Sequence, residues 1–156
     1  MWKMMEIIMW IIALAMIAYI DVRTRRVYLG ILIIPTLYSL VLSAFGVEGF
    51  FIRVVTCIVI FVMFRLVSLV SKGGMGAGDA YVLAALSTSL GFMSAVEVIL
   101  LSFSGAALYG ALRLVGTRAR RNISFPFVPF IFFSYLGVVI CKLIVIEEAA
   151  LQLRPL

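Results

Sequence analysis

The sequence predicts an all-α, polytopic integral membrane protein with about six transmembrane helices. Of its 156 residues, 65% are hydrophobic, and the mean hydropathy is +1.26, whereas a soluble domain is roughly 45–50% apolar. The apolar residues also form several runs near the ~20 residues that span a bilayer. Little sequence remains between these runs, so we expect one membrane domain covering residues 1–156.

Six apolar runs define the predicted spans: Met4–Ile20, Tyr28–Phe45, Phe50–Val70, Asp79–Phe92, about Val98–Val115 and about Phe127–Ile146. The first run ends at Asp21 with no small-residue cleavage site, which indicates a retained helix rather than a signal peptide. Pro35 is expected to kink the second span, where neighbouring helices can satisfy the freed backbone groups. The pattern defines the break between the fourth and fifth spans least well, somewhere from Gly91 to Glu97.

Positive charges predict the orientation of the chain. Basic residues follow the first, third and fifth runs: Arg23, Arg25, Arg26, Lys72, Arg118, Arg120 and Arg121. Lys and Arg are enriched in cytoplasmic loops, so these loops are expected in the cytoplasm and both termini outside, in a cell (plasma or inner) membrane. This bias also accounts for the net charge of +6 without a nucleic-acid partner.

The acidic residues are distributed differently from the basic ones across the predicted membrane. All five glutamates fall on the outer side of this topology, whereas Asp21 and Asp79, the two aspartates of the chain, fall on the cytoplasmic side near helix ends. Acids contribute little to topology, so this sorting is independent of the rule that set the orientation. Two carboxylates that share a site retain one proton between them. Such a pair supplies both a base and an acid, so Asp21 and Asp79 are the candidate catalytic residues.

Other chemistries find little support in the sequence. The chain has no histidine, which removes His-based zinc sites and Ser-His-Asp catalysis. Cys57 and Cys141 lie inside apolar runs without a Cys-x-x-Cys motif, so we expect buried thiols and no metal. Structural roles stay open for the aspartates: Asp21 as the ion-pair partner of a following arginine, and Asp79 as the N-cap of the fourth span.

A glycine-rich stretch, residues 73–79, leads into Asp79. It lacks the Gly-Lys-Ser/Thr ending of a phosphate loop and the strand context of a dinucleotide site. Glycines permit positive φ and close backbone approach. We therefore assign Gly74, Gly76 and Gly78 to a loop that leaves room for an extended substrate strand, with a flexible turn as the alternative.

Three segments carry a resemblance to a known family. Gly76-Ala77-Gly78-Asp79 is similar to the Gly-x-Gly-Asp signature of intramembrane aspartyl proteases. The run from Gly74 to Leu86 resembles the type IV prepilin peptidases, which include the preflagellin peptidases. Asp21-Val-Arg-Thr-Arg-Arg-Val27 looks like their first aspartate segment, and Phe125-Pro-Phe-Val-Pro-Phe130 like their Pro-Phe-x-Pro entry to the last helix.

The resemblance implies an endopeptidase that uses Asp21 and Asp79, with no metal or organic cofactor, to cleave basic leaders from prepilin-like precursors at the cytoplasmic membrane face. Two positions depart from the family: Val27-Tyr28-Leu29 replaces Ile-Pro-Asn, and Ala80-Tyr81 replaces Val-Lys. The longer bacterial members also carry a Cys-x-x-Cys-containing domain and methylate the new amino terminus. This chain lacks that region, so the resemblance implies cleavage without methylation.

Three other functions remain open at this point. A small proton-coupled transporter would use the two aspartates as carriers, but deep in the bilayer and with internal symmetry. A catalytically silent pilus-assembly protein would keep both aspartates without using them. A presenilin-type protease shares Gly-x-Gly-Asp, but its first aspartate is expected after a tyrosine, and here Ile20 precedes Asp21.

Overall fold

Within the residues that the structure describes, the chain forms six α-helices and no strand. The computed structural model describes residues 2–25, 27–45, 49–70, 76–116 and 126–152. The helices are α1 (Trp2–Thr24), α2 (Gly30–Phe45), α3 (Phe50–Val70), α4 (Ala77–Leu90), α5 (Phe92–Gly116) and α6 (Val128–Gln152). The predicted all-α fold is therefore confirmed. Several residues used in the sequence predictions lie outside the described residues: Arg26, Glu48, Lys72, Gly74, Arg118, Arg120 and Arg121.

Four of the helices are long and apolar enough to cross a membrane: α1, α3, α5 and α6. The two others are shorter, α2 with 16 residues and α4 with 14. At 1.5 Å per residue α4 is about 21 Å long, less than the ~30 Å hydrocarbon core of a bilayer. The protein is thus a polytopic membrane protein with six helices, of which four have the length of a full span.

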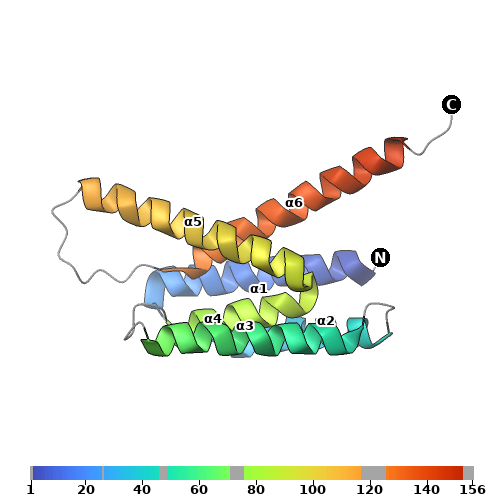
Figure 1. Cartoon of the computed structure of the whole chain (residues 1–156), viewed down its shortest axis with the longest axis horizontal. Helices are drawn as coiled ribbons and strands as arrows, with labels where there is room; N and C mark the ends of the chain where they lie inside the picture. Colours follow the sequence, from blue (N-terminus) through green and yellow to red (C-terminus); the bar gives the residue numbers. More distant parts are fainter. Residues whose placement is uncertain (1, 26, 46–48, 71–75, 117–125, 153–156) are drawn as a thin grey trace.

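The short helix α4 forms the centre of the bundle. It packs against α3 and also contacts α2, α5 and α6, and most of its residues are buried. Figure 1 shows α1 to α4 lying alongside one another, whereas α5 and α6 cross and their far halves extend away from the other four helices. Because a helix enclosed on all sides needs no amphipathic stripe, α4 is apolar around its whole circumference except near its ends.

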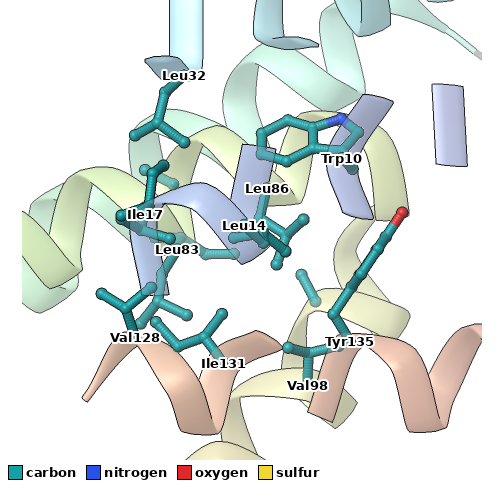
Figure 2. Packing of buried hydrophobic residues seen from close by; sticks show 14 of the residues in the cluster. Trp10, Leu14, Ile17, Leu32, Leu83, Leu86, Val98, Val128, Ile131 and Tyr135 are labelled. Atoms are coloured by element: carbon teal, nitrogen blue, oxygen red, sulfur yellow. The ribbon is translucent and has the colours of Figure 1, made fainter. Parts of the chain in front are cut away.

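Apolar side chains from all six of these helices meet in one core. Figure 2 shows Trp10, Leu14 and Ile17 of α1 facing Leu83 and Leu86 of α4, with Val128, Ile131 and Tyr135 of α6 on the far side and Leu32 of α2 and Val98 of α5 at the edges. Moving one such side chain out of water would contribute roughly 1.5–3 kcal/mol to stability. In a bilayer the helices are surrounded by lipid instead of water, so close packing between them provides the stabilisation. The core therefore fixes the ends of α1, α4 and α6 relative to one another.

Two differences between the observed and the predicted helix boundaries affect the surroundings of the aspartates. The first span continues beyond Ile20 to Thr24, so Asp21 lies inside the last turn of α1. The break between the fourth and fifth spans is a single residue, Gly91, whose φ of 73° is in the left-handed region that favours glycine. The fifth helix therefore begins at Phe92 rather than near Val98.

Polar contacts hold the bundle at the end of α4 that lies away from Asp79. The Arg53 guanidinium of α3 donates from Nη1 to the carbonyl oxygens of Thr88 and Ser89, at 2.7 and 2.9 Å. These are among the last carbonyls of α4, which have no partner within the helix. Lys142 of α6 donates to Ser94 Oγ at the start of α5.

Candidate active site

Asp21 projects from the last turn of α1 toward the beginning of α6. Its side chain is 6% exposed. The backbone N–H of Val128 donates to Asp21 Oδ2 at 3.3 Å, and the N–H of Phe127 also hydrogen-bonds the carboxyl group. Two residues from the far end of the sequence thus supply main-chain donors to the first predicted catalytic residue.

The local sequence explains why these donors are available. The carbonyl of Phe127 accepts the N–H of Phe130 at 3.0 Å and that of Ile131 at 3.4 Å, so Phe127 caps the first turn of α6. The first N–H groups of a helix have no partner within it. Pro126 and Pro129 have no N–H at all, so the segment presents the two N–H groups that lie between its prolines. A carboxylate at this position also meets the positive end of the α6 dipole.

Asp79 occupies the first turn of α4, the central helix. It is 8% exposed. The N-cap of α4 is Gly76, which has an extended φ/ψ of −65°/136°, and Asp79 is the third helical residue. The N–H of Gly76 hydrogen-bonds the Asp79 carboxyl group, the side-chain-to-N-cap half of a capping box. The alternative that Asp79 is itself the N-cap is therefore wrong.

The structure brings Asp21 and Asp79 together. The two carboxyl groups lie close enough for the charge of Asp21 to act on Asp79. The segment that follows Asp21 also packs directly on the turn that carries Asp79, because Val27 lies against Gly78. Two residues from distant parts of the sequence thus share one buried end of the bundle. The guanidinium of Arg23, one possible ion-pair partner for Asp21, lies 5.1 Å above the ring of Tyr19.

Two glycines beside Asp79 have specific reasons to lack a side chain. A Cβ on Gly78 would lie 2.8 Å from Val27 Cγ2 and 2.9 Å from Val27 Cβ, so only glycine allows this approach. A Cβ on Gly76 would lie 3.1 Å from Asp79 Oδ2. The structure therefore assigns both glycines to packing around the aspartates. Contact with a substrate strand stays a prediction for them, as it does for Gly74, which lies outside the described residues.

Aromatic rings lie beside the Asp21 end of the site. Phe103 of α5 contacts Phe127 at 5.0 Å between ring centroids, and it stacks on Phe64 of α3 at 5.7 Å. The ring of Tyr81, two residues after Asp79, lies 4.9 Å from Phe61. These rings extend the apolar surroundings of the carboxyl groups from α4 to α3 and α5. Phenylalanines of this kind are frequent in membrane helices, so the sequence carried no signal that would single them out.

Other candidate sites are weaker. The described residues contain no group of three or more His, Cys, Asp or Glu side chains that could hold a metal ion. Cys57 is half-buried and Cys141 is exposed, so the prediction of buried thiols is wrong for Cys141. A cavity of about 650 Å³ lies between α5 and α6, with Glu97 and Lys142 in its lining, and it includes neither aspartate.

The fold and the site define a polytopic helical membrane protein with a buried pair of carboxyl groups at one end of its bundle. The model of the Type IV leader peptidase family matches residues 8–111 of the chain, a range that includes both aspartates and the glycine-rich stretch. The chain belongs to this family of peptidases. No curated protein and no solved structure is similar enough to the chain to count as a match. The proline-flanked start of α6 lies outside the matched residues.

Proposed function

We propose that this protein is an aspartic endopeptidase that removes leader peptides from prepilin-like or preflagellin-like precursors, with Asp21 and Asp79 as its catalytic residues. The observation that carries the proposal is the meeting of the two aspartates at one buried end of the bundle. Membership of a leader peptidase family supports the reaction class. The arginines that follow α1 support a cytoplasmic active site and outside termini, because Lys and Arg are enriched in cytoplasmic loops.

The pair contains the groups that peptide hydrolysis needs. One carboxylate takes a proton from water while the water oxygen adds to the scissile carbonyl carbon, and the other carboxyl group donates its proton to the carbonyl oxygen. The C–N bond then breaks. The first carboxyl group passes its proton to the leaving amine nitrogen, and a hydroxyl proton of the adduct returns to the second. No proton is gained or lost overall, and no metal or organic cofactor takes part in this scheme.

A substrate with a basic leader and a hydrophobic helix after the cut suits this site. The helix would enter the bilayer beside the bundle, so the scissile bond would lie at the membrane boundary, where α1 ends and α4 begins. The aromatic rings next to Asp21 offer an apolar neighbourhood for the first residues of that helix. The leader itself would stay in the cytoplasm.

Co-expression with a tagged prepilin-like precursor tests the proposal. Wild type should shorten the precursor, and Asp21→Asn and Asp79→Asn should each stop cleavage, because asparagine keeps the size but cannot exchange the proton. Glu6→Gln is the matched control, since Glu6 is also a buried carboxyl group of α1 but lies near its opposite end. This variant should still cleave. If either asparagine variant cleaves as fast as wild type while present in the membrane, the assignment is wrong. Absence of any cleavage by wild type would favour a silent assembly protein or a transporter.

A further inference from the structure

The two aspartates differ in how many main-chain donors of the described residues reach them. Asp21 receives the N–H groups of Phe127 and Val128 from α6. Among the described residues, Asp79 receives one main-chain N–H, that of Gly76 at the N-cap of its own helix. Both side chains are almost equally buried, at 6% and 8% exposure, so water does not offset the difference. Hydrogen bonds donated to a carboxyl group favour its ionised form.

The charges around Asp21 must also be considered. Asp21 lies in the last turn of α1, where the helix dipole disfavours a negative charge, and the positive end of α6 opposes that effect. Arg23 follows on its own helix, Arg25 comes directly after the end of that helix, and Asp79 faces it from α4. The helix α2 contains no charged residue. The nearest described charged residue of α6 is Lys142, four turns beyond Val128.

We propose that the first turn of α6 is part of the catalytic apparatus: the N–H groups of Phe127 and Val128 hold Asp21 as the ionised member of the pair, and Asp79 carries the shared proton. This rests on the proposed function and assigns its two roles. Asp21 is the base that takes the proton of the attacking water, and Asp79 is the acid that protonates the carbonyl oxygen. Phe127 and Val128 are positioning residues, which act through their main chain.

A proline at residue 128 tests the hydrogen bond from the Val128 N–H to Asp21, because it removes that N–H. Val128 is the first helical residue of α6, where proline fits the helix and removes only the N–H. Phe127 is at the cap position, where residues typically have the extended backbone that a residue before proline favours. Val128→Pro therefore removes the donor to Asp21 Oδ2. Val128→Ala is the matched control, because it loses side-chain packing to a similar extent and keeps the N–H.

The measurement is labelling by a hydrophobic carbodiimide, which reacts with protonated carboxyl groups, followed by mass spectrometry of each aspartate across a pH series. In the wild-type protein, labelling of Asp79 should persist to higher pH than labelling of Asp21. Val128→Pro should raise the labelling midpoint of Asp21 by about one pH unit relative to Val128→Ala, as expected for the loss of one hydrogen bond to a charged group.

Equal midpoints in the two variants would overturn the proposal, and so would wild-type labelling of Asp21 that persists to higher pH than that of Asp79. Phe127→Pro, with Phe127→Ala as its control, removes the other N–H and repeats the test if Val128→Pro fails to fold. Cleavage of a tagged precursor is measured on the same samples. If wild type does not cleave, the proposed function fails, while the labelling still decides whether α6 holds Asp21 ionised.

Discussion

The contact between Gly78 and Val27 predicts a large loss of activity from a single methyl group. Gly78→Ala would add a Cβ at 2.8 Å from Val27 Cγ2 and 2.9 Å from Val27 Cβ. Ordinary carbon contacts begin near ~3.5 Å, so the two segments must separate by about 0.7 Å. Rotation of the valine side chain relieves only the first contact, because Cβ is attached to the backbone. The backbone next to Asp79 or after Asp21 therefore has to move.

The magnitude of the effect separates activity from stability. Overpacking costs about 1–3 kcal/mol, whereas alanine gains roughly 0.8–1.0 kcal/mol over glycine in a helix. The net loss of stability is thus about 1 kcal/mol. A displacement of about 1 Å at a catalytic pair, in contrast, costs on the order of 100-fold in rate. We expect Gly78→Ala to lower kcat by at least about tenfold while the protein remains folded.

The assay compares initial cleavage rates at saturating precursor with thermal unfolding in the same detergent. Gly110→Ala is the control, because a Cβ on Gly110 of α5 meets nothing within 4 Å. Val27→Gly removes both contacting atoms, so the double variant Gly78→Ala/Val27→Gly should recover most of the rate relative to Val27→Gly alone. If Gly78→Ala cleaves at the wild-type rate, or if Val27→Gly gives no recovery, the reasoning from this contact is refuted.

Three further predictions test the fold and its orientation. Trp10→Phe removes the indole N–H that donates to Ser39 Oγ at 2.9 Å in the core. It should therefore lower the free energy of unfolding by about 1 kcal/mol. Thermal unfolding measures this, and an unchanged melting temperature would contradict it. Arg53→Lys keeps the charge but replaces the planar guanidinium by a shorter side chain, which loses the geometry of the two hydrogen bonds to α4. Unfolding should therefore become easier by roughly 1 kcal/mol, and Arg53→Met should lose more. Equal melting curves for all three proteins would refute the cap. In a cysteine-free background, Thr24→Cys should react with an impermeant maleimide only from the cytoplasm and Gly49→Cys only from outside, and labelling of both from one side would contradict the orientation.

The sequence predicted the helices, and it singled out the two aspartates as the candidate site, for physical reasons. Apolar runs of near-bilayer length define helices without any knowledge of their partners, and the charge sorting isolated Asp21 and Asp79 before any contact was known. The short length of α4 was visible in its 14 residues. Its position at the centre of the bundle was not, because apolar residues look alike whether they face lipid or protein.

The residues that surround the aspartates could not be predicted from the sequence. The donors to Asp21 are main-chain N–H groups of Phe127 and Val128, and every residue except proline has one. The one signal was the pair of prolines around them, which we interpreted as the start of a helix. Gly78 likewise suggested space for a substrate, whereas its neighbour is Val27, which only the folded chain brings near. Contacts between distant segments have no local pattern.

The most direct test of the central claim is a double-mutant cycle on the aspartates. Single-turnover cleavage of a purified precursor in lipid nanodiscs is measured for wild type, Asp21→Asn, Asp79→Asn and the double variant. Residues that act as one catalytic unit are strongly non-additive, so the double variant should be no slower than either single variant. If the losses instead multiply, or if one single variant keeps a rate close to wild type, Asp21 and Asp79 do not form one catalytic pair.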